Sequence, residues 1–295
     1  MRFFEKRPML MIGLGVVGIS LSSIFVKFST APSAVTAAWR LLWTVALMTP
    51  VVWGKASVRR ELLGVRWKTA ALSALSGLFL AIHFVFWFES LNQTSVASST
   101  TIVCTEVIWV CLGWCLFMGG KIPAKAIAAI ALTLAGSVLI AFADSSSAGH
   151  LYGDVLALIA AVAVAVYTLI GRVVRSRAST TVYTYLVYAA CALVLTATCA
   201  LQGQRLLGHG LSPILVGLAL AVFSTILGHS IFSWCLKFFS PSFVSVSKLC
   251  EPVAAAALAA VIFAQIPTAM QLLGGGLVLG GVFWYSRIEG KEESK

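Results

Sequence analysis

Ser240-Pro-Ser-Phe-Val-Ser-Val-Ser-Lys-Leu-Cys-Glu-Pro252 leads into an alanine-rich apolar segment that ends near Ala264. The stretch is typical of a membrane-spanning helix, yet it contains Lys248 and Glu251, three positions apart on one helical face and close enough to pair. A charge at membrane depth costs at least ~2.5 kcal/mol on insertion scales. Pro252 removes a backbone hydrogen bond and can kink the helix beside the charges. The stretch therefore predicts a wet, protein-lined cavity inside a membrane protein.

The composition indicates an all-α integral membrane protein. The chain has 295 residues, of which 60% are hydrophobic and only 11% are charged, whereas soluble domains carry about 25% charged residues. A bilayer span needs roughly 20 apolar residues, and short polar breaks separate ten such segments. The predicted spans are Met9–Phe28, Ala34–Trp53, Thr69–Leu91, Ser95–Met118, Ala124–Ala143, Tyr152–Arg172, Thr180–Leu201, Ser212–Leu236, Pro241–Phe263 and Thr268–Ser286.

The formal net charge is +11, and the placement of the cations predicts the topology. If the loops alternate between two faces, only Lys27 and Arg205 lie opposite the N-terminus, while Arg40 and Lys248 lie inside spans. The face of the N-terminus holds Arg2, Lys6, Arg7, Lys55, Arg59, Arg60, Arg66, Lys68, Lys121, Lys125, Arg172, Arg175, Arg177, Lys237, Arg287, Lys291 and Lys295. Cytoplasmic loops accumulate Lys and Arg, so we expect a multi-pass protein of the cytoplasmic membrane with both termini cytoplasmic. The lipid bilayer explains the charge without nucleic acid as a partner.

The sequence is expected to contain two five-helix repeats, residues 1–145 and 146–295. The segment around His83 aligns with the segment around His229, and Cys-Thr-Glu106 aligns with Leu-Cys-Glu251. An odd number of helices in each repeat reverses the second copy relative to the membrane. Inverted repeats of this kind are common in transporters, whose substrate sites lie near the bilayer midplane.

Motifs for catalysis or cofactor binding are absent from the sequence, which contains no Walker A, G-x-S-x-G or H-E-x-x-H pattern. We therefore predict no enzyme activity, no catalytic residue, no cofactor and no metal site. A G-x-G-x-x-G pattern at Gly13–Gly18 lacks a preceding strand, and we interpret it, like the G-x-x-x-G at Gly276–Gly280, as helix packing. The seven cysteines form no C-x-x-C pattern; a soft-metal site is left open only for the stripe Cys104, Cys111 and Cys115.

The charged residues inside spans are the main candidates for a binding site. Glu106 lies about eleven residues from one end of its span, near mid-depth at 1.5 Å per residue, and Glu251 occupies the matching position in the second half. With Lys248 they would form a polar centre that sees a substrate ammonium group or a proton; the alternative is that each glutamate pairs with a cation and serves packing. Arg40 lies close to a span end, so we expect a structural role with the side chain reaching outward.

Histidines and aromatic residues complete the candidate site. His83 and His229 occupy equivalent repeat positions and would form the shell of the polar centre, or simply bond a neighbouring helix. Because histidine can change charge near neutral pH, a coupling proton is left open as a partner. The aromatic side chains that could line a cavity and stack on a substrate, or merely pack, are Trp87, Trp109, Tyr167 and Trp234.

These residues resemble the EamA-type branch of the drug/metabolite transporter superfamily. The resemblance is carried by Gly228-His229 to Lys237, by Phe243 to Pro252 and by the glycine-rich run 272–281, with the same pattern in the first half. It implies ten helices in two inverted five-helix repeats. It also implies a central cavity lined by the first, third, fourth, sixth, eighth and ninth helices, and export of amino acids or related metabolites.

We therefore expect a secondary active transporter that moves a small polar molecule, an amino acid or a relative, out of the cell by alternating access. A zwitterion suits a cavity that offers both signs of charge. An exporter of cationic drugs or other organic cations is a second hypothesis, favoured if Lys248 pairs with Glu251 and leaves Glu106 free. An uptake carrier or exchanger of the same fold, a channel and a membrane enzyme are further alternatives. No particular substrate, coupling ion or oligomeric state is predicted.

Overall fold

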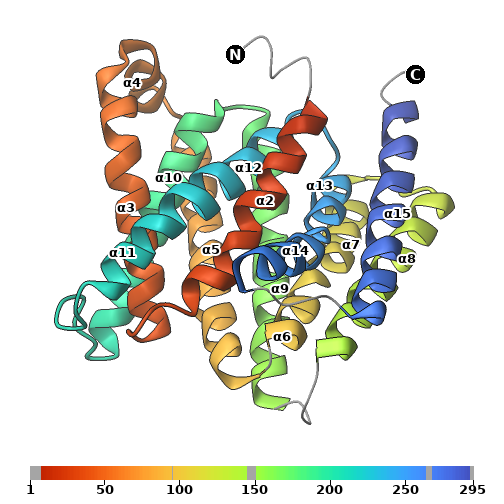
Figure 1. The fold of residues 1–295 in the computed structure, drawn as a ribbon. Coiled ribbons are helices and arrows are strands. Elements are labelled where there is room, and N and C mark those ends of the chain that lie inside the picture. The colour runs from red at the N-terminus through yellow and green to blue at the C-terminus, as the bar shows by residue number, and fades with distance from the viewer. Residues whose placement is uncertain (1–7, 95, 145–150, 264–267, 293–295) are drawn as a thin grey trace.

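The structure, a computed structural model, describes residues 8–94, 96–144, 151–263 and 268–292, and in these ranges it contains helices and no strand (Figure 1). The predicted loop cations Arg2, Lys6, Arg7 and Lys295 lie outside the described residues. The helices are α2 (Pro8–Val26), α3 (Ser33–Gly54), α4 (Ala56–Leu63), α5 (Trp67–Gln93), α6 (Val96–Cys104), α7 (Glu106–Met118), α8 (Ala124–Asp144), α9 (Leu151–Arg175), α10 (Thr180–Leu201), α11 (Ser212–Ala219), the π-helix η1 (Leu220–His229), α12 (Ser230–Cys235), α13 (Pro241–Lys248), α14 (Glu251–Phe263) and α15 (Ala269–Glu292).

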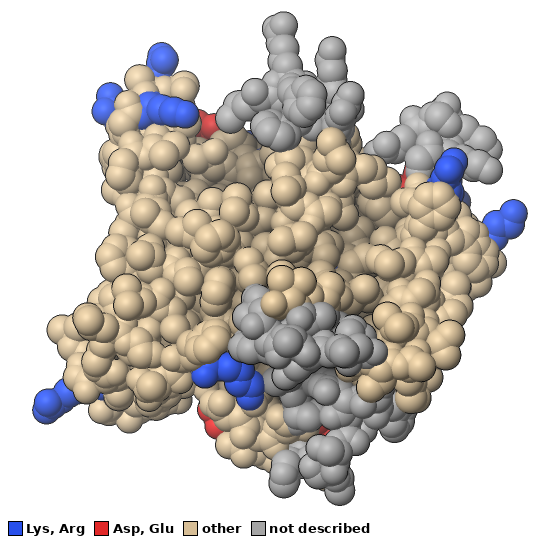
Figure 2. Space-filling model, viewed as in Figure 1, with Lys and Arg blue, Asp and Glu red and all other residues tan. Residues whose placement is uncertain are grey.

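The described helices form an integral membrane protein. Eight of them, counting α6 with α7 and α11 with η1 and α12, are long and apolar enough to cross a bilayer, and a shorter apolar helix covers Ala124–Ile140. Helices occupy all ten predicted segments, although ten crossings stay a prediction. On the described part of the face in Figure 2, charged side chains gather toward the upper and lower margins, with a wide uncharged band between them. This band is the surface expected against lipid tails.

Two of the predicted spans are each broken into two helices at matching positions. The fourth span breaks at Thr105, where α6 ends and α7 begins, and the ninth breaks between Lys248 and Glu251. In the ninth span Pro252 supplies no backbone N–H, which favours its place in the first turn of α14. In the fourth span no proline is present; Thr105 instead closes a tight turn, with its N–H and its hydroxyl both bonded to the carbonyl of Ile102 at 3.0 and 2.6 Å. Each break leaves a glutamate, Glu106 or Glu251, in the first turn of the following helix.

The helices pack in pairs that exchange partners between the two halves. The first helix of one half lies against the third of the other: α2 packs along η1, and α9 packs along α5. The second helices, α3 and α10, pack on each other, and so do the fifth helices, α8 and α15 (Figure 1). The start of α2 and the end of α15 lie at the same edge of the molecule. This exchange is the pattern expected of two repeats, while their inversion stays a prediction.

Glycines permit the closest helix contacts, at positions that differ in part from those predicted. A Cβ on Gly18 of α2 would lie 2.8 Å from a backbone oxygen of η1, and Cβ atoms on Gly136 and Gly274 would lie 2.6 and 2.7 Å from each other's carbonyl oxygens. These distances leave no room for a side chain. The predicted packing face of Gly276 and Gly280 is wrong, because nothing lies within 4 Å of a Cβ built on either residue. The face of α15 that meets α8 is the one that carries Gly274.

Candidate functional site

A small cavity lies between the two broken helices. Its lining comes from α2, α5, α6, α7, α9, η1, α13 and α14, which belong to the first, third, fourth, sixth, eighth and ninth predicted spans, the set that the resemblance implied. The lining residues are Ile19, Ser22, His83, Trp87, Val103, Glu106, Val164, His229, Lys248 and Glu251. Its volume is about 40 Å³, which holds about three water molecules. A larger solute therefore requires the surrounding helices to separate.

An ion pair joins the two breaks across the cavity. Lys248 Nζ lies 2.9 Å from Glu106 Oε1, and the two side chains are only 11% and 5% exposed. Lys248 is the last residue of α13 and Glu106 is the first of α7, so each charge is also favoured by the end of the helix that carries it. The pairing of Lys248 with Glu251 that their spacing allowed is not formed: both side chains line the cavity, but the ammonium of Lys248 bonds Glu106.

The pairing leaves Glu251 as a free carboxylate in the cavity. Its side chain makes no hydrogen bond or ion pair with any described residue, and the charges that act on it are those of Glu106, Lys248 and Arg40. The indole N–H of Trp87, which also lines the cavity, is buried without a hydrogen-bond acceptor among the described residues. Buried polar groups are normally paired, so a free acceptor and a free donor in one cavity indicate a ligand or ordered water.

His83 and His229 lie side by side at the cavity, with ring centroids 6.4 Å apart. His83 Nδ1 lies 3.0 Å from the carbonyl oxygen of Ala160. A carbonyl can only accept, so this nitrogen carries a proton, and the ring anchors α5 to α9. His83 also stacks on Trp87, with centroids 5.6 Å apart and planes at 17°. One histidine thus has a clear packing role, while the His229 ring lies against the rings of His83, Phe84 and Tyr167 and has no hydrogen bond to the described residues.

Arg40 is fully buried, which corrects the expectation that its side chain reaches outward. Its Nε donates to Thr225 Oγ1 at 2.7 Å and its Nη1 donates to Ser22 Oγ at 3.1 Å, while the guanidinium carbon lies 4.2 Å from the centre of the Phe84 ring. Nη2 has no partner among the described residues. Arg40 therefore lies directly behind Ser22 of the cavity wall. Its buried partners come from three other helices, so the position of the arginine in its span did not reveal them.

The remaining predicted site residues lie away from the cavity lining. Tyr167 is buried one layer behind it, and its hydroxyl bonds Ser233 Oγ at 2.8 Å. Trp109 is 37% exposed on the outer side of α7, and Trp234 packs on Phe238 with ring centroids 4.4 Å apart. Six of the nine predicted residues therefore meet in one place, and these three aromatic residues do not line it.

Two matching contacts, which sequence reasoning missed, lie at the C-terminal ends of α2 and α9. Lys27 Nζ donates to the carbonyl of Leu91 at 3.2 Å. Arg172 donates to the carbonyls of Leu236 and Phe239, the latter at 3.1 Å. Adding 145 to 27 and 91 gives 172 and 236, so the two contacts join equivalent repeat positions. The sequence indicated that Lys27 and Arg172 occupy equivalent repeat positions, but it did not indicate the carbonyl groups that they bond.

Comparisons with known proteins agree with these observations. Residues 151–287 match the sequence profile of the EamA-like transporter family. Two proteins of Archaeoglobus fulgidus, both described as an uncharacterized transporter, are similar. One is 31% identical over 134 residues, which is 44% of each chain, and the other is 25% identical over 226 residues, which is 74% of this chain and 78% of the relative. The chain thus spans less than half of the first relative.

A solved crystal structure has the same fold. It superposes with a TM-score of 0.79 over 98% of this chain and 99% of the other, at 18% sequence identity.

Among the described residues, no group of three potential ligands could hold a metal ion.

Proposed function

We propose that this protein, whose residues 151–287 match the EamA-like transporter family, is a membrane transporter that exports small polar metabolites, amino acids or related compounds, by alternating access. Glu106, Lys248 and Glu251 form the polar centre of the site, with His83, His229 and Trp87 around it. The site works by binding, and the proposed reaction is transport without covalent chemistry.

The observation that carries this proposal is the pair of unpartnered groups in the cavity. Glu251 offers a carboxylate that is free to accept from an ammonium group, and Trp87 offers an N–H that is free to donate to a carboxylate. The positive charges of Lys248 and Arg40 both act on the Glu251 carboxyl group, and Nη2 of Arg40 has no partner among the described residues. An amino acid carries one group of each kind, so it can satisfy both at once. Without such a ligand, the buried donor and acceptor would stay unpaired, which costs free energy.

Alternating access accounts for the small volume of the cavity. At about 40 Å³ the site is too small for an amino acid, and the contacts of Lys27 and Arg172 lie at the C-terminal ends of the equivalent helices α2 and α9, which the predicted inversion of the repeats would place at opposite faces. Releasing one contact while the other stays formed would open the cavity to one face only. We propose that this exchange is the transport step.

Export of organic cations is a second candidate, and the free carboxylate favours it. A cation needs only Glu251, whereas a zwitterion also needs the donors. The two candidates differ in whether a carboxylate on the substrate matters. An amino acid and its amide or ester, which carries the ammonium group alone, therefore separate them by competition.

The test is efflux from proteoliposomes loaded with a mixture of radiolabelled amino acids and with tetraethylammonium. We expect saturable efflux of at least one amino acid, and Glu251→Gln should lower its initial rate at least tenfold at equal incorporation. Glu292→Gln, the same change at the last residue of α15, is the matched control and should transport like the native chain.

Efflux of tetraethylammonium without any amino acid would support the second candidate. Wild-type rates in Glu251→Gln, with the reconstituted protein shown to be folded, would remove Glu251 from the site. A rate that never saturates with concentration would indicate a channel and contradict a carrier.

A further inference from the structure

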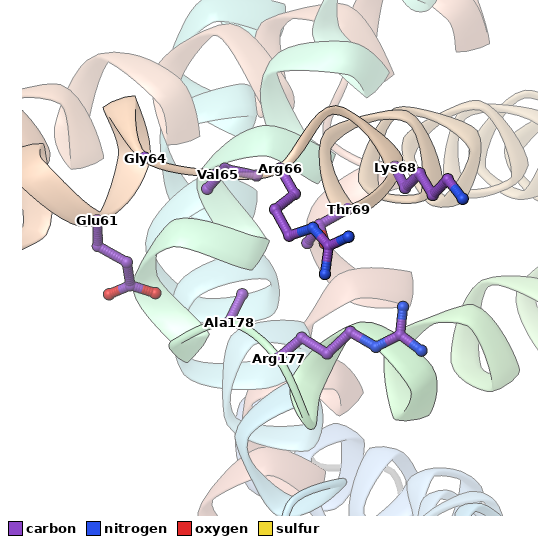
Figure 3. Close-up of a pocket in the computed structure, with 8 residues that line it drawn as sticks. All are labelled: Glu61, Gly64, Val65, Arg66, Lys68, Thr69, Arg177 and Ala178. Carbon is purple, nitrogen blue, oxygen red and sulfur yellow. The ribbon is translucent and has the colours of Figure 1, made fainter.

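A second and much larger cavity, of about 680 Å³, opens at the face that the charge distribution predicts to be cytoplasmic (Figure 3). It lies between the loop that joins α4 to α5 and the loop that joins α9 to α10. Its lining consists of Glu61, Gly64, Val65, Arg66, Lys68, Thr69, Arg177 and Ala178. The volume is within the 300–1,000 Å³ typical of ligand pockets, and this cavity shares no residue with the central one.

The basic side chains of the pocket form no ion pair with the described residues. The side chains of Arg66 and Arg177 make no hydrogen bond or ion pair with the described residues, and the ammonium of Lys68 contacts only the Trp67 ring, 5.9 Å from its centre. Glu61 is the one carboxylate in the lining, and it is engaged, because its Oε1 accepts from the backbone N–H of Ser179 at 2.6 Å. Figure 3 shows Glu61 on the opposite side of the pocket from the three basic side chains. The basic side therefore presents three cations to an anion.

The surroundings place this pocket at the depth of lipid headgroups. The short helix α4 contains Arg59 and Arg60 and buries none of its residues, as expected of a helix that lies on a membrane surface. Leu63 at its end and Trp67 at the start of α5 are 70% and 75% exposed. Exposed tryptophan is typical of the membrane interface. Exposed apolar side chains that are sequence neighbours of the residues lining a basic pocket suit a molecule with a charged head and an apolar tail.

We propose that this pocket binds a phosphate group, and that its source is an anionic phospholipid of the cytoplasmic leaflet. The planar guanidinium groups of Arg66 and Arg177 suit a phosphate, because each can donate two parallel hydrogen bonds to two of its oxygens. The lipid tails would lie along Leu63 and Trp67. Because Arg66 precedes α5 and Arg177 follows α9, a bound phosphate joins the cytoplasmic ends of the two helices that pack along each other. Nothing in this proposal depends on the transported substrate.

The experiment uses the full chain, purified and delipidated in a neutral detergent, and measures thermal stabilisation as phosphatidylglycerol is added. Phosphatidylcholine, whose headgroup has no net charge, is the lipid control, and inorganic phosphate is the soluble probe. The test variant is R66Q/R177Q, and the matched control is K121Q/K125Q, which removes two exposed cations from the same predicted face. R66K/R177K keeps the charge and guards against misfolding of the first variant.

We expect phosphatidylglycerol to stabilise the native chain and the control, and its half-saturating concentration to rise about 30-fold in R66Q/R177Q, since each cation near an anionic surface is worth about a factor of five. The lysine variant should lie between. Stabilisation by inorganic phosphate alone, lost in R66Q/R177Q, would keep the phosphate site and assign it a soluble source. Equal responses of R66Q/R177Q and K121Q/K125Q, with both variants folded, would overturn the proposal.

Discussion

Breaking the ion pair between the two interrupted helices should destabilise the protein more than any single charge change at its surface. In Glu106→Gln the ammonium of Lys248 stays buried, 11% exposed, without its partner 2.9 Å away. Removing one partner of a buried pair costs about 3–5 kcal/mol. We expect about 3 kcal/mol, the lower end, because the Glu251 carboxylate also acts on this cavity and compensates part of the charge.

The double variant Glu106→Gln, Lys248→Met separates pairing from packing. With both charges removed no uncompensated ion is buried, and replacing a buried pair by neutral groups is often near neutral. The double variant should therefore be at least about 1 kcal/mol more stable than Glu106→Gln alone. Lys125→Met, a charge removed from an exposed position on α8, should change stability by less than about 0.5 kcal/mol.

The assay is reversible unfolding in mixed detergent micelles, followed by far-ultraviolet circular dichroism, with all variants in the same micelle composition. A thermodynamic cycle over the native chain, Glu106→Gln, Lys248→Met and the double variant gives the coupling between the two residues. If the losses of the two single variants simply add in the double variant, the two side chains do not interact in the folded state, and the central site described above is wrong. Transport by the double variant should be lost even where its stability recovers.

Two further perturbations test the packing and the helix-end contacts. Gly274→Val should cost about 1–3 kcal/mol of stability by overpacking, because its Cβ would press on the backbone of α8, whereas Gly280→Val, at an open position, should unfold at the native temperature in a thermal scan. Lys27→Met and Arg172→Met should each release one of the two helix-end contacts. The probe is Val103→Cys in the cavity of an otherwise cysteine-free protein. It should react with a membrane-impermeant thiol reagent from one face in the first variant and from the opposite face in the second. Reaction from the same face in both would contradict a paired arrangement of the two contacts.

The sequence determined the class of protein and the depth of its charges. Hydropathy is a local property, so the ten apolar segments could be read directly, and helices are found in each of them. The match between the surroundings of Glu106 and Glu251 likewise predicted two equivalent mid-depth carboxylates, and both line the central cavity together with His83 and His229. These features depend on composition and spacing within one segment.

Only the tertiary structure decided the partners of those charges. Lys248 pairs with a glutamate 142 positions away in the sequence and not with the one three positions away, because the helix is interrupted after Lys248 and α7 brings Glu106 to it. Arg40 turns inward because Ser22 and Thr225, on two other helices, accept its hydrogen bonds. The basic pocket is built by two loops that are far apart in the sequence. The hydrophobicity of a segment determines that it enters the membrane. The neighbour that each face of the helix contacts depends on the packing of all the helices at once.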